Sequence, residues 1–381
     1  MIAPLPLLLA CADTPVDGWF VVVEGRVVAA DGAPLDAAEV ALFAPDGAPV
    51  AVTTTGPDGA WTLPILGDAL AGNQLVAFAR ADGYAEGRAT FDLNLAAPRV
   101  TSLSAGPGQT WDTTARRLSA IQLAPAASTA TVAGRVVDAA TGLPVGGAAL
   151  TVQHGWNAPI GAPAVATAVT DAEGRYAATV DRPGAHTVSV AAADGWGAAR
   201  FPAMFLEQGG SSTGAVAQET APGALVATVL WGDSPTNLDL HLTGPLRGGQ
   251  AGADGNGRFH VWSGAPRHPT RDDVDAEAVL VLADADGRGP ETVTLTDPGR
   301  GELRLTVFDA DNWSDAENLD LAASGAVLQV WWGEDYPRYY TIDPTAVATA
   351  WQVVEIDVET GVSYVNEAYG VGADPTDPDA F

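Results

Sequence analysis

The residues of this chain best suited to chemistry are carboxylates gathered in glycine-containing turns. The segment DADGRGPE brings three of them together, at Asp284, Asp286 and Glu291. Asp239 lies just before His241 in a strand-like segment and is a candidate to approach them in the folded chain. Calcium prefers oxygen ligands in irregular turns, and clustered carboxylates repel one another unless a cation neutralises them. The sequence therefore predicts a calcium site at these four carboxylates, with solvated turns as the alternative.

A second acidic run, DADNWSDAEN, spaces its oxygen ligands somewhat as an EF-hand loop does. Its candidate ligands are Asp309, Asp311, Asn312 and Asp315. Trp313 occupies a ligand position, however, and Ser314 stands where such a loop needs glycine. The run is therefore not an EF-hand, and solvated turns are the expected structure.

Three histidines, His241, His260 and His268, lie in the C-terminal part of the chain. A zinc site is conceivable there because imidazole nitrogens are zinc ligands. The surrounding residues favour ordinary positions, since HVW is typical of a strand and His268 follows proline and arginine in a loop. The sequence contains no HExxH motif and no Gly-x-Ser-x-Gly motif, so it indicates no catalytic centre.

Two pairs of neighbouring aromatic residues are candidates for a sugar-stacking surface. They are Trp331-Trp332 and Tyr339-Tyr340. Successive residues of a strand point to opposite faces, so at most one member of each pair is expected to be exposed. A carbohydrate-binding surface is therefore an alternative to a core position for these residues.

The single cysteine, Cys11, offers a different chemistry. It follows an apolar segment, and the order Leu8-Leu9-Ala10-Cys11 resembles the lipobox of bacterial lipoproteins. In that family the cysteine is lipidated and becomes the N-terminus after cleavage. The resemblance implies a signal peptide and lipobox at residues 1–11, and an exported lipoprotein of the outer membrane or cell surface. A buried cysteine after an apolar first strand is the alternative.

The charge of the chain excludes one class of partner. The formal net charge is −29, and every basic side chain among the 18 is arginine. No basic stripe is present, so nucleic-acid binding and attachment to anionic lipid through a polybasic face are not expected. No run of 18 apolar residues occurs, which argues against an ordinary transmembrane helix. The expected partners are the membrane, through the lipid anchor, and an envelope protein or polysaccharide.

The elements that must position these residues are predicted to be strands. Val, Thr, Trp and Tyr recur in short segments separated by Gly, Pro and Asp turns, which is typical of an all-β protein. The segment from Glu24, EGRVVAADGAPLDAAEVALFA, is repeated from Ala133 as AGRVVDAATGLPVGGAALTVQ. PDGAW and AEGRY then repeat a hairpin that places Trp61 and Tyr176 at equivalent strand starts. We expect two equivalent antiparallel sandwiches with these two rings in their cores.

The repeated motifs resemble the carboxypeptidase regulatory-like domain, a transthyretin-like sandwich. The first copy offers Gly25-Arg26-Val27, Gly32-Ala33-Pro34-Leu35 and Asp58-Gly59-Ala60-Trp61. The second offers Gly134-Arg135-Val136, Gly142-Leu143-Pro144-Val145 and Glu173-Gly174-Arg175-Tyr176. The resemblance implies two such domains, at residues 17–125 and 129–218. Small-residue segments at 123–130 and 207–224 are predicted to be flexible joints, so the sandwiches should unfold as separable units.

A third, larger β-sandwich is predicted at residues 222–371, followed by an acidic tail at 372–381. Trp231, the segment NLDLHL (237–242) and DADGRGPE together resemble the uncharacterised YfaP-like family of secreted bacterial β-domains. That resemblance implies a fold and no activity.

These expectations describe a non-enzymatic, lipid-anchored protein of the cell envelope. Its two repeated sandwiches would form a stalk, and its C-terminal sandwich would present a binding or interaction surface. A glycan-binding accessory protein is the first alternative, and an uncharacterised hydrolase is the second. Calcium is the one cofactor for which the sequence offers candidate ligands.

Overall fold

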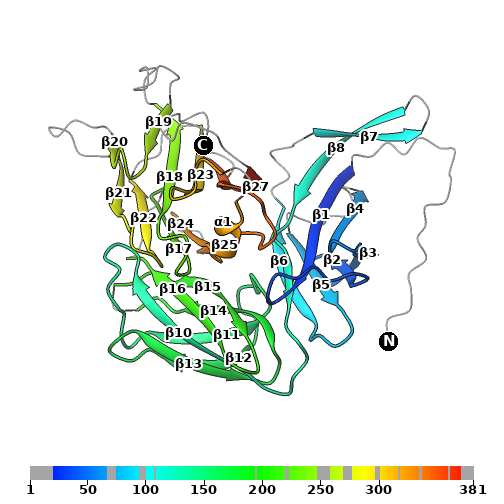
Figure 1. Ribbon diagram of the computed structural model, residues 1–381, viewed down its shortest axis with the longest axis horizontal. Coiled ribbons are helices and arrows are strands. Elements are labelled where there is room, and N and C mark those ends of the chain that lie inside the picture. Colours follow the sequence, from blue (N-terminus) through cyan, green and yellow to red (C-terminus); the bar gives the residue numbers. More distant parts are fainter. Residues whose placement is uncertain are drawn as a thin grey trace.

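The computed structural model is almost entirely β-structure. It describes residues 20–66, 74–93, 100–106, 109–193, 195–218, 223–246, 258–268, 277–296, 301–315, 318–333, 337–358 and 361–369. Figure 1 shows three β-sandwiches that follow one another along the chain. The all-β fold of tandem sandwiches is thus confirmed. Cys11 and the tail at 372–381 lie outside the described residues.

The first sandwich packs two sheets around a core of valine, leucine and alanine. One sheet has the order β4-β1-β8-β7, with β9 also beside β1, and the other has the order β3-β2-β5-β6. The strands are β1 (Phe20–Ala29), β2 (Glu39–Phe43), β3 (Pro49–Thr54), β4 (Ala60–Leu66), β5 (Gln74–Arg80), β6 (Gly87–Asp92), β7 (Val100–Gly106), β8 (Gln109–Arg117) and β9 (Ile121–Leu123).

The second sandwich has sheets of order β13-β10-β16 and β12-β11-β14-β15. Its strands are β10 (Ala130–Asp138), β11 (Ala149–His154), β12 (Ala164–Val169), β13 (Arg175–Val180), β14 (Gly184–Val190), β15 (Ala199–Phe205) and β16 (Gly210–Val216). Strand β16 lies in the middle of the segment predicted to be a flexible joint, where it pairs in parallel with β10. The prediction was wrong for residues 210–216, because they form a strand in which Gly214 lies directly against the ring of Phe201.

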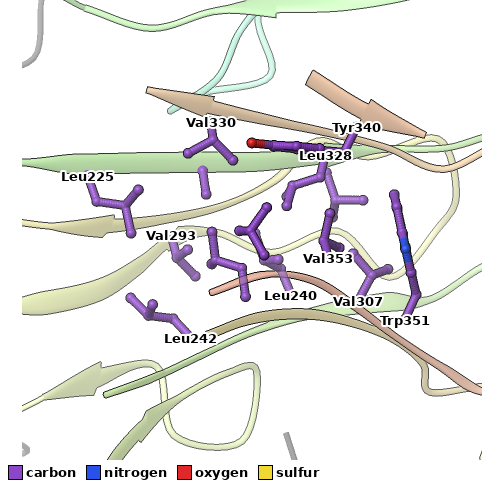
Figure 2. Close-up of a cluster of buried hydrophobic side chains, with 14 of the residues drawn as sticks. Leu225, Leu240, Leu242, Val293, Val307, Leu328, Val330, Tyr340, Trp351 and Val353 are labelled. Atoms are coloured by element: carbon purple, nitrogen blue, oxygen red, sulfur yellow. The ribbon is translucent and has the colours of Figure 1, made fainter. Parts of the chain in front are cut away.

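The third sandwich has sheets of order β20-β21-β22-β17-β24-β25 and β19-β18-β23-β26-β27. Its elements are β17 (Leu225–Leu230), β18 (Leu238–Pro245), β19 (Arg258–Val261), β20 (Arg267–His268), β21 (Ala278–Leu282), β22 (Glu291–Leu295), β23 (Glu302–Asp309), α1 (Asp320–Ala323), β24 (Val327–Trp332), β25 (Arg338–Thr341), β26 (Ala350–Asp357) and β27 (Gly361–Tyr369). Figure 2 shows its core, where Leu240 and Leu242 of one sheet face Leu225 and Val293 of the other.

The turns of the two repeated sandwiches use the same glycine. Val27 N–H donates to the carbonyl of Gly59 at 2.9 Å, and Val136 N–H donates to the carbonyl of Gly174 at 2.8 Å. Both glycines have a φ of 72°. A Cβ on either one would lie 2.5 Å from the carbonyl oxygen of the partner valine. The repeated glycine is therefore required both by its backbone conformation and by the close approach of the chain.

The aromatic residues of the repeat lie in the two cores, as predicted. Trp61 is 3% exposed and Tyr176 is 5% exposed. Each ring packs against a glycine of the neighbouring strand, Gly25 in the first sandwich and Gly134 in the second. A side chain at either glycine would occupy the space of the ring, so the Gly-Arg-Val motif and the aromatic position depend on each other.

A residue of the second sandwich extends one sheet of the first. Strand β6 is the edge of its sheet, and Trp156 pairs with it in parallel. Trp156 N–H donates to the carbonyl of Arg88 at 2.9 Å, and Thr90 N–H donates to the carbonyl of Trp156 at 2.9 Å. The indole ring is buried in the core of the first sandwich. The segment 123–130, predicted to be a flexible joint, is also hydrogen-bonded to the first sandwich, since Ala126 N–H donates to the carbonyl of Gly83 at 2.9 Å.

Side chains of β24 join the third sandwich to the second. Gln329 is fully buried, and its amide accepts from Ala215 N–H at 2.7 Å and donates to the carbonyls of Arg200 (2.9 Å) and Ala215 (3.1 Å). Trp331 donates from its indole nitrogen to the carbonyl of Ala198 at 2.9 Å. Trp331 and Leu230 belong to the same buried cluster as the core of the second sandwich.

The third sandwich also contacts the first. The Arg26 guanidinium donates to Thr345 Oγ1 at 2.9 Å and lies 3.9 Å from the Asp343 carboxylate. Strand β27 contacts β8, and Figure 1 shows these two strands close together. The third sandwich thus packs against both others instead of lying at the far end of a row. We therefore expect the three cores to unfold cooperatively, in contrast to the separable units predicted from the joints.

Candidate functional site

The structure brings two of the predicted calcium ligands together inside the third sandwich. Glu291, at the start of β22, is fully buried, and its Oε1 accepts from Leu240 N–H at 2.8 Å. Asp239, on β18, is also buried and accepts from the Ser263 hydroxyl at 2.8 Å. The pKa of Glu291 is raised to about 8. Burial is the main cause, and the negative charge of the nearby Asp239 carboxylate is the second. Burial likewise raises the pKa of Asp239.

The other two predicted ligands lie in the turn before β22. Asp284 Oδ1 accepts from the N–H groups of Asp286 (2.9 Å) and Gly287 (3.2 Å), which fixes the turn. Burial raises the pKa of Asp284, whereas Asp286 is exposed. Within the described residues, no group of three or more His, Cys, Asp or Glu side chains is placed to hold a metal ion. Calcium binding therefore stays a prediction.

Glu291→Gln tests the electrostatics of this cluster. Glu291 keeps its proton up to about pH 8 in the folded chain, but loses it above its ordinary pKa of 4.5 in the unfolded chain. Between those values the folded state binds more protons, so the free energy of unfolding should fall as pH rises, by up to about 1.4 kcal/mol per pH unit. The glutamine variant cannot ionise and should show a flatter profile in denaturant titrations.

The exposed Glu173→Gln is the matched control and should keep the wild-type profile. Calcium would hold Glu291 ionised, so excess calcium should raise the melting temperature of the wild type near pH 8 and leave Glu291→Gln unchanged. Identical wild-type melting curves with calcium and with chelator would reject the calcium site.

The second acidic run holds loops together. Asp311 Oδ2 accepts from Thr236 N–H (2.8 Å), the Thr236 hydroxyl (2.7 Å) and Asn237 N–H (3.0 Å). Asp309 is fully buried and accepts from the backbone and side-chain amides of Asn312. These hydrogen bonds tie Asp311 to the loop at Thr236 and Asn237, so the run serves as a brace between two loops of the third sandwich.

The structure brings together two of the three candidate zinc histidines. His241 Nδ1 and His260 Nε2 lie 2.8 Å apart, and both rings stack on Trp262. His268 instead stacks on Phe259, with 5.1 Å between ring centroids. The two neighbouring imidazoles face each other at hydrogen-bond distance, which is not the arrangement of two nitrogens around one zinc ion.

The aromatic pairs do not form a sugar-stacking surface. Trp331, Tyr339 and Tyr340 are all buried, and the half-buried Trp332 packs against the core of the third sandwich. Strand alternation correctly placed one residue of each pair toward that core. The opposite face is covered by the second sandwich, which no local pattern in the sequence could indicate.

A cleft of about 320 Å³ lies where the three sandwiches meet. The residues that line it come from β5, β6 and the loop before β9, from the 156–160 loop and β15, and from β25. They are Gln74, Ala89, Thr90, Phe91, Ser119, Trp156, Asn157, Ala158, Pro159, Ile160, Arg200, Arg338, Tyr339, Tyr340 and Thr341. Two guanidinium groups are among them and, within the described residues, no carboxylate, although the chain has a net charge of −29.

Hydrogen bonds fix one wall of this cleft. The Tyr339 hydroxyl accepts from Asn157 N–H at 2.6 Å and lies 2.9 Å from Thr187 Oγ1. The Arg200 guanidinium donates to the carbonyl of Ala158. Sequence reasoning missed the cleft because its walls come from segments that are distant along the chain and carry no motif in common.

None of the curated protein sequences compared with the chain matches it. Solved structures give weak likenesses. The TIE protein of Bacillus anthracis is 14% identical with a TM-score of 0.20, over 53% of this chain and 34% of that one. The shaft pilin SpaA of Lactobacillus rhamnosus GG is 13% identical with a TM-score of 0.19, over 53% and 98%. Neither likeness carries an inference about function.

One family model matches part of the chain, in the place where the second copy of the repeat was predicted. It is consistent with the turn glycine and the core tyrosine described above for that sandwich. Residues 131–218 match the carboxypeptidase regulatory-like domain.

Proposed function

We propose that the protein is a non-enzymatic, lipid-anchored component of the cell envelope that holds its ligand in the cleft between the three sandwiches. The observation that supports this function is the convergence of all three sandwiches on one cleft whose wall is fixed by Tyr339. Binding sites favour such domain junctions, because several elements can contribute polar groups to one ligand. The third sandwich would take part as a YfaP-like domain, beside the other two instead of beyond them.

The chemistry of the cleft favours an anionic saccharide as the ligand. Arg200 and Arg338 supply positive charge, and guanidinium groups pair well with carboxylates. Gln74, Asn157 and Thr341 add amide and hydroxyl groups suited to sugar hydroxyls. The sequence already offered glycan binding as an alternative function. The proposed glycan site now lies in the junction cleft instead of on the aromatic pairs. No described arrangement favours the hydrolase alternative.

Arg338→Gln tests the cleft. Isothermal titration of the whole chain with oligogalacturonate should show binding that is about tenfold weaker in this variant, because a charge-assisted hydrogen bond is lost. Arg175→Gln removes the same charge at an exposed position outside the cleft and should bind as the wild type does. Equal binding of a neutral cello-oligosaccharide, or an unchanged affinity in Arg338→Gln, would contradict an anionic ligand.

Cys11→Ser tests the anchor. The variant should lose incorporation of labelled fatty acid and leave the membrane fraction, since stable attachment depends on the acyl chains. The described part of the chain contains no helix long and apolar enough to cross a membrane. Membrane fractionation of the serine variant, together with a wild type that takes up no label, would refute lipidation.

A further inference from the structure

A second cavity, also of about 320 Å³, lies on the outer face of the first sandwich. Its floor is formed by Ala41 and Phe43 of β2 and Val76 and Phe78 of β5. These side chains point away from the core, since the alternate residues, such as Leu42, are the ones packed inside. Apolar side chains thus form a hollow on the face of the sheet that points away from the core. We call it the outer groove.

Two aromatic rings and the Arg88 cation give the outer groove its chemistry, and the ion pair of Arg80 with Glu39 also lines it. Phe43 and Phe78 make an edge-to-face pair with ring centroids 5.4 Å apart. The Arg88 guanidinium lies over the Phe78 ring, 5.4 Å from its centroid. An apolar floor therefore adjoins a positive charge, and the ring is already in contact with that charge.

Arg88 differs from its neighbour Arg80. Arg80 pairs with the carboxylates of Glu86 (2.5 Å) and Glu39 (3.8 Å). Among the described residues, Arg88 has no carboxylate within ion-pair distance, and its buried Nε has no hydrogen-bond partner. In a chain with 47 acidic residues and 18 basic ones, a cation left without a carboxylate is poised for an external anion.

The repeat provides an internal comparison. In the ladder of the second sandwich, Thr151 pairs with Ser189 and Gln153 pairs with Thr187, at the places where the first sandwich pairs Ala41 with Phe78 and Phe43 with Val76. The same positions are thus polar in one copy and apolar in the other. Because the second sandwich folds with polar side chains there, the two phenylalanines are not a requirement of the fold.

We propose that the outer groove binds a small organic carboxylate with an aromatic or similarly flat apolar body. The apolar body would cover Phe43 and Phe78, and the carboxylate would pair with the Arg88 guanidinium. A cavity of about 320 Å³ is at the lower end of the range for small-molecule sites. This site is separate from the junction cleft and does not depend on the function proposed for it.

The test is a titration of the whole chain with phenylacetate and, in parallel, with its neutral isostere phenylacetamide, followed by saturation-transfer NMR and calorimetry. Phenylacetate should bind, and the amide about tenfold more weakly, because it lacks the charge that pairs with Arg88. Equal binding of the acid and the amide, or no binding of either at millimolar concentration, would overturn the proposal.

Variants locate the site. Arg88→Gln should weaken phenylacetate to the affinity of the amide, whereas Arg175→Gln should change neither. Phe78→Ser and Phe43→Gln introduce the residue types found in the second sandwich and should abolish binding of both probes at an unchanged melting temperature. If Arg338→Gln weakens phenylacetate and Arg88→Gln does not, the probe binds in the junction cleft and the outer groove is rejected. If a phenylalanine variant fails to fold, the Arg88→Gln and Arg338→Gln results still decide.

Discussion

Replacing Trp156 with alanine is expected to lower the free energy of unfolding by about 3–5 kcal/mol, as for other large aromatic side chains removed from a core. The indole belongs to the second sandwich along the chain but is buried in the core of the first. Its loss should therefore open a cavity in one sandwich and weaken the connection to another. Calorimetry should show a single cooperative transition in the wild type and a separate, earlier transition of the first sandwich in the variant.

Trp313→Ala is the matched control, because Trp313 is 49% exposed on the third sandwich. It should change the unfolding free energy by less than about 0.5 kcal/mol. Wild-type unfolding in three resolved transitions, or equal effects of the two substitutions, would show that the sandwiches are independent.

Replacing Gln329 with leucine is expected to cost at least about 3 kcal/mol. The leucine would fit the space but would leave Ala215 N–H, Ala215 C=O and Arg200 C=O buried without the hydrogen bonds that the amide provides. Each unsatisfied buried polar group costs about 1–3 kcal/mol. Denaturant titration should detect the loss as a lower midpoint, and the transition should broaden as the second and third sandwiches uncouple.

Gln352→Leu makes the same chemical change on β26, where the amide is only partly buried and donates to Glu355 at 2.9 Å. Its cost should stay below about 1 kcal/mol. A similar loss in both variants would mean that Gln329 contributes no more than a surface amide does.

The repeated sandwiches were predictable because their signals are local. Gly59 and Gly174 mark turns that only glycine can form, and Trp61 and Tyr176 follow them at a fixed spacing. Such patterns depend on backbone conformation and strand alternation, and both can be inferred from short segments. Asp239 was named from the sequence only as a candidate to approach Glu291, and the burial of the two carboxylates and their hydrogen bonds to Ser263 and Leu240 were not predicted.

The interfaces and the junction cleft were not predictable in this way. Gln329 looks like an ordinary polar strand residue, and only the fold reveals that it hydrogen-bonds the backbone of another sandwich. Strand alternation predicts that Trp331 points away from the core of the third sandwich. It cannot predict that the second sandwich covers this side chain, because Ala198 lies more than a hundred residues away along the chain. The small residues at 207–224 indicated a flexible joint by composition, whereas residues 210–216 form β16, where Gly214 lets the ring of Phe201 approach the strand.

The pairing of Trp156 with β6 also decides whether the first copy of the repeat can stand alone as a domain. Two copies of a domain that each fold alone can be separated without loss of stability in either one. Here the first sandwich takes a bridge residue and a buried indole from its neighbour, so a fragment that ends before residue 156 would lack part of its own core. The smallest part of the chain that can keep the first core intact therefore extends past its own boundary, as far as residue 156.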